Sequence, residues 1–233
     1  MVFLCRSCYT GLEIVPEVRG LMMTVVTAPQ VEVNVTPVSA AAQARPWPRQ
    51  GEWTYADYAR LPNDQWQYEI IKGELRMAPA PRTRHQEISL NLATLLHQRT
   101  RSQHLGRVFT APIDVILPDP ITDTDLAAPV QPDILFIVQE RLSIIQDKFI
   151  VGAPDLIVEI LSPSNWLDDR RDKFLVYEAA GVREYWIVDP DTCLVEVFVL
   201  RGDQYTQVGR YAPGDSIHSE VVAGFEIAVS AFC

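Results

Sequence analysis

The chain has 233 residues, of which 48% are hydrophobic and 21% are charged, and its formal net charge is −10. This composition suits a globular protein with a sizeable core, in one domain or two. The negative charge argues against a protein that coats nucleic acid through many phosphate contacts, but it is compatible with an enzyme whose metal site is acidic.

No stretch of the chain approaches the roughly eighteen apolar residues that span a bilayer. The first twenty residues do not resemble a signal peptide, because Arg6, Glu13 and Glu17 interrupt their apolar run. We therefore expect a soluble, cytoplasmic protein without a membrane anchor.

The four cysteines do not predict a disulfide framework. Cys193 and Cys233 are isolated in the sequence, and Cys5 and Cys8 form one CxxC pair that no second CxxC or HxxxH follows. A zinc site usually needs four such ligands, so we assign no metal to this pair.

The N-terminal part of the chain is predicted to be a flexible arm, residues 1–50, because prolines and alternating small residues leave little helical periodicity. Met22 and Met23 precede the sequence TVVTAPQ, which looks like a natural start, so residues 1–22 fit a mis-annotated start. Residues 51–233 are predicted to form a single domain.

The first elements of that domain are a short helix, a hairpin and a long helix. Thr54 can cap the helix YADYARL, which stops before Pro62. Residues 67–79 read as two strands joined by a Lys72-Gly73 turn. In residues 82–103 the apolar side chains recur at helical spacing, which predicts an amphipathic helix of about 17 residues.

Strands dominate the rest of the chain, interrupted by one helix. We predict strands at 108–118, 130–138, 155–161 and 182–190, a connection with a short helix at 139–152, a helix at 167–181, a hairpin at 194–211 that turns at Gly202-Asp203, and a last strand or short helix at 223–232. Three strands before the second helix favour an α+β fold with a central mixed sheet flanked by helices, with β-hairpins near both ends of the domain.

Carboxylates interrupt two strands that are otherwise strongly apolar. Asp133 lies near the start of one strand, and Asp155 and Glu159 lie in the next, on the same face. A buried carboxylate needs a partner, and Mg²⁺ takes oxygen ligands of this kind. Asp155 follows Pro154 at the strand edge, so it can equally bind local backbone N–H groups.

A cation follows in the next helix. Lys173 shares a helical face with Val176, Tyr177 and Ala180, and that face should meet the sheet. An inward lysine beside two carboxylates could orient a water or stabilise phosphate charge. The alternative is that Lys173 is one of several solvated charges in DDRRDK.

The segments YEIIKGEL, PRTRH, QPDILF, GAPDLIVEILSPS and DKFLVYEAAGVREYWIVDP together resemble the Uma-two family of "putative restriction endonucleases", long described as a domain of unknown function. The resemblance extends from Trp53 to Phe232. It implies the PD-(D/E)XK nuclease-like fold, with a restriction-endonuclease-like αβββαβ core.

In that superfamily an Asp and a Glu from adjacent strands hold Mg²⁺, and a Lys two residues after the Glu assists the attacking water. The resemblance assigns the acidic positions to Asp133 and Glu159. Leu161 stands at the usual lysine position, and the resemblance suggests that Lys173 replaces this lysine from the following helix.

Accessory residues are also implied by the resemblance. An acidic residue from the first helix or the region before it often joins such sites, and Glu69, Glu74 and Glu87 are candidates here. His85 precedes the helix at a position typical of the family.

The activity implied is hydrolysis of DNA phosphodiester bonds by a water bound to Mg²⁺ or Mn²⁺, without a covalent intermediate. Two cuts on duplex DNA suit a homodimer, by analogy. Two alternatives stay open: a catalytically inactive module that keeps the nuclease fold for interactions, and a phosphohydrolase that acts on small substrates.

Overall fold

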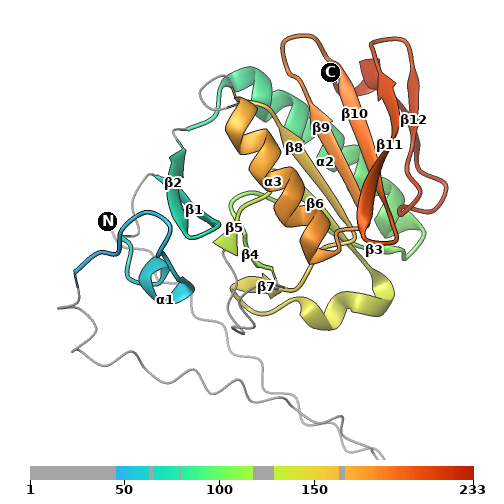
Figure 1. Ribbon diagram of the computed structural model, residues 1–233. Coiled ribbons are helices and arrows are strands. Elements are labelled where there is room, and N and C mark those ends of the chain that lie inside the picture. Colours follow the sequence, from blue (N-terminus) through green and yellow to red (C-terminus); the bar gives the residue numbers. More distant parts are fainter. Residues whose placement is uncertain (1–45, 63–65, 79, 118–128, 163–165) are drawn as a thin grey trace, which may run out of the picture. The chain divides into compact units, whose positions relative to one another are not determined.

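The computed structural model describes residues 46–62, 66–78, 80–117, 129–162 and 166–233 (Figure 1). The predictions for residues 1–45 lie outside this part. The helices of the described part are α1 (Tyr55–Tyr58), α2 (Thr83–Ser102) and α3 (Trp166–Ala180), with 3-10 helices η2 (Gln139–Ile144) and η3 (Val229–Ala231). Its strands are β1 (Gln67–Ile71), β2 (Glu74–Ala78), β3 (Gly106–Thr110), β4 (Asp114–Ile116), β5 (Pro129–Val130), β6 (Ile134–Val138), β7 (Phe149–Val151), β8 (Leu156–Ile160), β9 (Glu184–Val188), β10 (Val195–Arg201), β11 (Gln204–Tyr211), β12 (Ser216–His218) and β13 (Glu226–Ala228).

A six-stranded mixed sheet, in the order β11-β10-β9-β8-β6-β3, forms the centre of the fold. Only the pair β8–β9 is parallel, and the other neighbours are antiparallel. The helix α3 provides the crossover between the two parallel strands, as parallel pairing requires. The order α2-β3-β6-β8-α3-β9 confirms the predicted αβββαβ core, and β10 and β11 extend its sheet.

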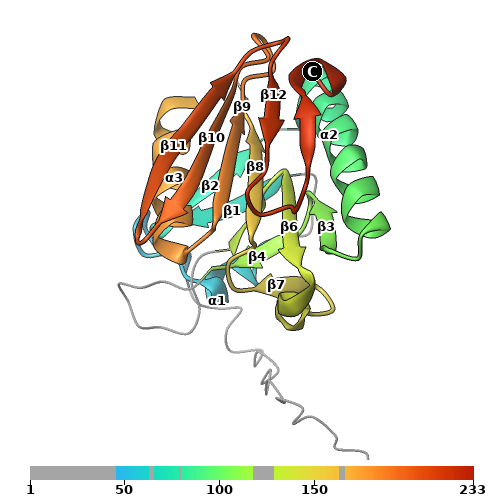
Figure 2. The same ribbon diagram turned by 90° about the vertical axis from the view of Figure 1, so that its right-hand side faces the viewer.

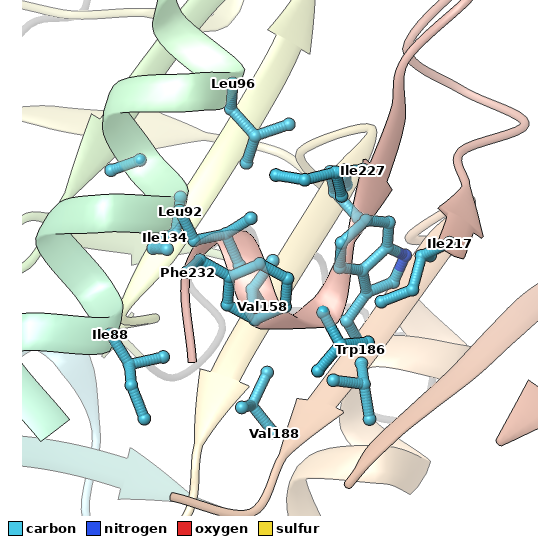
Figure 3. Close-up of a cluster of buried hydrophobic side chains, with 14 of the residues drawn as sticks. Ile88, Leu92, Leu96, Ile134, Val158, Trp186, Val188, Ile217, Ile227 and Phe232 are labelled. Atoms are coloured by element: carbon cyan, nitrogen blue, oxygen red, sulfur yellow. The ribbon is translucent and has the colours of Figure 1, made fainter. Parts of the chain in front are cut away.

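Helices α2 and α3 lie on opposite faces of this sheet (Figures 1 and 2). Ile88, Leu92 and Leu96 form the buried stripe of α2 that the helical spacing predicts, and each is fully buried. They pack against strands β6, β8 and β9, and the C-terminal strands β12 and β13 close the same cluster around Trp186 (Figure 3). A second apolar cluster lies under α3 on the other face.

Two of the predicted strands are divided between sheets, which corrects the predicted spans. The segment 108–118 becomes β3 and β4, separated at the cis peptide Ala111-Pro112, and the segment 130–138 becomes β5 and β6. Proline has no N–H to donate to a strand ladder, and Pro112 and Pro132 both lie in the breaks. Strands β4, β5 and β7 form a separate three-stranded sheet. Asp133 therefore lies in the link before β6.

The β1–β2 hairpin turns at Lys72 and Gly73, as predicted, and both residues have positive φ, at 52° and 74°. A side chain at Gly73 would also meet the carbonyl of Gly51, which would lie 2.5 Å from an added Cβ. Residue Gln50, at the end of the predicted arm, bonds the backbone of Leu75 through both atoms of its amide, at 2.8 and 3.0 Å. The N-terminal segment thus contacts the hairpin from residue 50 onward.

Asp155 is a structural residue in this fold, in agreement with the simpler of its two interpretations. It is completely buried, and one carboxylate oxygen accepts a hydrogen bond from the backbone N–H of Val138 at 2.9 Å. Arg141 and Arg183 contact its other oxygen at 2.7 and 3.2 Å. These contacts tie the start of β8 to the end of β6.

Cys193 and Cys233 form a disulfide, which corrects the prediction that they are isolated. Forty residues separate them in sequence, so their spacing gave no signal of the pairing. The bond joins the turn after β9 to the last residue of the chain. Arg84 of α2 donates to the backbone carbonyl of Cys233 at 2.7 Å and contacts the Cys193 sulfur at 3.3 Å.

Removal of this disulfide is expected to lower the free energy of unfolding by up to about 4 kcal/mol, the loop-closure value for a loop of this length. Urea denaturation of Cys233→Ala should show the loss, and wild type in reducing buffer should match the variant. A Cys5→Ser/Cys8→Ser background serves as the control, because it removes the other two thiols. Equal stability of oxidised and reduced protein in that background would contradict the expectation.

Candidate active site

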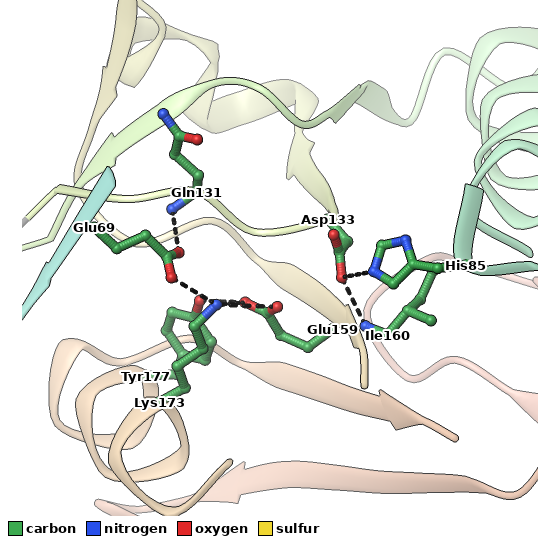
Figure 4. Close-up of polar contacts among 8 residues, drawn as sticks. All are labelled: Glu69, His85, Gln131, Asp133, Glu159, Ile160, Lys173 and Tyr177. Atoms are coloured by element: carbon green, nitrogen blue, oxygen red, sulfur yellow. Dashed lines mark hydrogen bonds and ion pairs between the residues drawn. The ribbon is translucent and has the colours of Figure 1, made fainter. Parts of the chain in front are cut away.

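Lys173 of α3 contacts two carboxylates that come from different strands (Figure 4). Its Nζ lies 3.2 Å from each carboxylate oxygen of Glu159 on β8 and 3.1 Å from Oε2 of Glu69 on β1. All three residues are at least 91% buried. The structure thus places Lys173 inward, and the alternative of a solvated charge is wrong.

The positions of these groups follow from simple periodicity. Glu159 is the fourth of the five residues of β8, where it pairs with Ile187 of β9, and the alternation of the strand directs its side chain toward α3. Lys173 and Tyr177 are four residues apart on α3 and therefore share one face. The Tyr177 hydroxyl, fully buried, donates a hydrogen bond of 2.6 Å to Oε1 of Glu159.

Two residues of this network had no assigned role in the sequence prediction. For Tyr177 the available signal is its spacing of four residues from Lys173, which puts both side chains on the same face of the helix. The backbone N–H of Gln131 donates to Oε1 of Glu69 at 2.8 Å, while the Gln131 amide donates to Asp114 at 2.8 Å. The contact with Glu69 is made by the backbone N–H of Gln131, which any residue except proline would provide. The identity of residue 131 therefore does not predict this contact.

Asp133 makes its contacts on the other side of Glu159, toward α2 (Figure 4). Its Oδ2 accepts a hydrogen bond from the backbone N–H of Ile160 at 2.8 Å and lies 3.1 Å from Nε2 of His85. These contacts fix Asp133 beside β8, next to Glu159. The predicted candidate His85 is therefore bonded to the predicted ligand Asp133.

With Glu69, Asp133 and Glu159 all ionised, the cluster would hold more negative than positive charge, and this affects the pKa values of its members. Burial raises the pKa of Glu159 to about 8, the charges of Asp133 and Glu69 act in the same direction, and Lys173 and Tyr177 oppose them. Burial acts against protonation of His85, but the hydrogen bond and charge of Asp133 outweigh it and raise the pKa of His85. Three carboxylates thus share one lysine and one histidine, and an added cation would reduce their repulsion.

Two of the predicted accessory residues lie outside this cluster. The side chain of Glu74 is 54% exposed and contacts Arg76 at 3.6 Å. The side chain of Glu87 is 60% exposed and pairs with Arg84 at 3.1 Å. Leu161, at the usual lysine position, packs against the apolar cluster under α3.

The donor set suits a hard cation with few protein ligands. No group of three or more His, Cys, Asp or Glu residues in the described ranges is arranged as a metal site. Mg²⁺ commonly binds through one or two carboxylates and completes its shell with water and substrate oxygens. Asp133 and Glu159 provide two carboxylates, each of which can accept more than one partner. The residues therefore fit such an ion.

In the absence of metal, the free energy of unfolding is expected to fall as pH rises from about 5 to about 8. Glu159 has its folded pKa raised from 4.5 to about 8, so the folded state binds the extra proton in this window, and the raised pKa of His85 acts with the same sign. The slope should reach about 1.4 kcal/mol per pH unit for one proton. Urea denaturation across this range measures the slope, and Glu159→Gln should flatten it. An unchanged slope in Glu159→Gln would contradict the assignment.

Comparison with known proteins settles the family. The profile described as Uma2, "Putative restriction endonuclease", matches residues 55–230. The chain belongs to the Uma2 family. A solved structure described as a putative nuclease belonging to DUF820, from Anabaena variabilis, superposes with a TM-score of 0.64 over 77% of this chain and 96% of that one, at 20% identity. At this identity the likeness shows the fold. No curated protein matches the chain.

Membership in the Uma2 family confirms the resemblance carried by the VEILSPS and GVREYWIVDP segments, and the neighbour's fold agrees with the restriction-endonuclease-like core. The description of the family supports a nuclease-like function. No helix in the described part of this Uma2 chain is long and apolar enough to cross a membrane.

Proposed function

We propose that this chain is a metal-dependent DNA endonuclease that hydrolyses phosphodiester bonds. The observation that carries the proposal is the buried contact of Lys173 with Glu159, next to Asp133, in a chain of the Uma2 family. This arrangement supplies the two carboxylates and the cation that a PD-(D/E)XK site requires, although the lysine comes from α3.

Asp133 and Glu159 would hold Mg²⁺ or Mn²⁺. When bound, such an ion supplies a water of lowered pKa and neutralises charge on the scissile phosphate. His85 and the Ile160 N–H both contact one oxygen of Asp133, which leaves its other oxygen without a hydrogen bond to any described residue. That oxygen is available for a ligand.

Lys173 carries the positive charge that would orient the attacking water or stabilise charge on the phosphate. Glu69 and Glu159 hold its Nζ from two sides, and Gln131 and Tyr177 hold those two carboxylates in turn. The lysine is therefore held in place before substrate arrives, which lowers the cost of reorganisation during the reaction.

The test is cleavage of a supercoiled plasmid with Mg²⁺, Mn²⁺, Ca²⁺ or EDTA, together with calorimetric titration of Mg²⁺. We expect nicked and linear products with Mg²⁺ or Mn²⁺ and none with EDTA. Absence of both metal binding and cleavage would favour the inactive interaction module. Hydrolysis of bis(p-nitrophenyl) phosphate without plasmid cleavage would favour the small-substrate phosphohydrolase.

Paired cuts on duplex DNA suit two copies related by a two-fold axis, so a homodimer is part of the proposal. Sedimentation velocity at the assay concentration tests it. A cytoplasmic location accords with a DNA substrate, and cell fractionation would decide it.

A further inference from the structure

The disulfide between Cys193 and Cys233 lies against the start of α2, the helix that carries His85. Arg84 precedes His85 in the first turn of this helix. Its Nη2 donates to the Cys233 carbonyl at 2.7 Å and lies 3.3 Å from Sγ of Cys193 and 3.7 Å from Sγ of Cys233. The disulfide ties Cys233, and with it this acceptor of Arg84, to the turn after β9.

The first turn of α2 also holds the proposed metal ligand Asp133. His85 is 92% buried, and its Nε2 lies 3.1 Å from Oδ2 of Asp133 (Figure 4). Arg84 and His85 line one hollow together with Pro190 and Asp191, which belong to the turn after β9. A continuous series of contacts therefore runs from the disulfide to Asp133.

Three features of the bond favour its reduction. Cys233 is partly exposed and Cys193 is buried, so an attacking thiolate would approach Cys233. Cys193 is then the leaving group, and the guanidinium of Arg84 beside its sulfur would stabilise the departing thiolate. Cys193 also has a φ of 56°, a left-handed conformation that is unfavourable for a residue with a side chain, and opening the bond removes one restraint that imposes it.

We propose that the Cys193–Cys233 bond is a site of thiol–disulfide exchange with a dithiol reductant, and that its state sets how firmly Asp133 is held. The inference rests on the proposed function, because an enzyme that acts on cellular DNA works where disulfides are rare and are usually transient, catalytic or redox-sensing. In the exchange the S–S bond opens to two thiols. The dithiol supplies two electrons and two protons and itself becomes a disulfide.

Reduction releases Cys233 from the turn after β9. Arg84 then keeps its ion pair with Glu87 but loses a carbonyl that is fixed in place. The first turn of α2 becomes more mobile, and His85 holds Asp133 less firmly. The oxidised protein is therefore the form in which Asp133 is already positioned for a metal ion.

Calorimetric titration of Mg²⁺ at set ratios of reduced to oxidised dithiothreitol tests this coupling. A Cys5→Ser/Cys8→Ser background serves as the parent protein, because it leaves only the two cysteines of the disulfide. The oxidised parent should bind Mg²⁺ about tenfold more tightly than the reduced parent, the lower end of the effect of losing a residue that orients a metal ligand.

Two arginine variants identify the route of the effect. Arg84→Gln should abolish the tenfold difference. Arg99→Gln is the matched control and should retain it, because Arg99 also donates to a backbone carbonyl, that of Ala223, but near the other end of α2. Equal affinities of the oxidised and reduced parent, or a difference that survives in Arg84→Gln, would overturn the proposal.

Amide hydrogen exchange followed by mass spectrometry gives a second readout that needs no metal. Reduction should accelerate exchange in residues 84–90 relative to residues 96–102, and Arg84→Gln should remove this difference between the two states. If these effects appear in a protein that neither binds Mg²⁺ nor cleaves DNA, the exchange site stands and the nuclease assignment fails.

Equal exchange of residues 84–90 in the two states would refute the proposal even for an active nuclease. Failure of the two cysteines to pair at every dithiothreitol ratio would refute it as well. Alkylation with iodoacetamide and mass measurement establish the state of the thiols in each sample, and thermal melting verifies that each variant is folded.

Discussion

Glu159→Gln is expected to lower the rate of DNA cleavage by about 1,000-fold, the rate equivalent of the several kcal/mol that a bound metal contributes. Glutamine keeps the size of the side chain and one carbonyl oxygen, but it loses the charge that would hold the ion. Single-turnover cleavage of a labelled duplex at saturating Mg²⁺ measures the effect, and calorimetry should show weaker metal binding in parallel.

The loss of activity in this variant should not come from unfolding. The substitution removes the repulsion of Glu159 by Asp133 and Glu69 and leaves Lys173 paired with Glu69. At pH 8 the variant should therefore be at least as stable as wild type. Glu74→Gln is the matched control, since that carboxylate is exposed and outside the cluster. Equal cleavage rates for the two variants would reject Glu159 as a metal ligand.

Lys173→Met is expected to cost about 3–5 kcal/mol of unfolding free energy at pH 8, because it leaves two buried carboxylates without their shared cation. The cost should be smaller at pH 5, because Glu159, with a pKa of about 8, holds a proton there in both proteins and does not need the charge of the lysine. Urea denaturation at the two pH values gives both numbers.

Two further variants separate charge from packing at this position. Adding Glu69→Gln to Lys173→Met should recover at least about 1 kcal/mol, the size of coupling seen between residues of one buried network. Arg201→Met is the matched control, because its ion pair with Glu220 is exposed, and it should change stability by less than about 1 kcal/mol. A loss that is the same at pH 5 and pH 8, with no recovery in the double variant, would mean that packing alone explains it.

Much of the core could be predicted because its signals are local. The apolar stripe of α2 and the turn at Lys72-Gly73 each depend on residues close in sequence, and all of these appear in the structure. The inward position of Lys173 was also predictable, since helical periodicity ties it to Val176 and Ala180. Glu159 stood out because a carboxylate within an apolar strand needs a partner.

The features that were missed depend on contacts between distant segments. Glu69 was one of three acidic candidates, but its contact with Lys173 was not predicted, because that contact requires the hairpin to lie against α3, where Lys72 pairs with Asp172 at 2.8 Å. The pairing of Cys193 with Cys233 depends on the fold, which brings the last residue next to the turn after β9. The breaks in the two predicted strands occur at prolines, which can be recognised in the local sequence. The local sequence does not indicate which sheet each half of a divided strand joins.

The two carboxylates that contact Lys173 lie on sheets of different size, which should differ in rigidity. Glu159 is on a strand hydrogen-bonded on both sides within a six-stranded sheet, whereas Glu69 is on a two-stranded hairpin. Interior strands open only with the whole domain, while small peripheral units open at lower cost. Glu159, the proposed metal ligand, should therefore keep its position up to the melting temperature. The β1–β2 hairpin is expected to open at a lower temperature, and Glu69 would then separate from Lys173. The positive charge of Lys173 would be less neutralised in this locally opened state, and therefore more available to a substrate, before the whole domain unfolds.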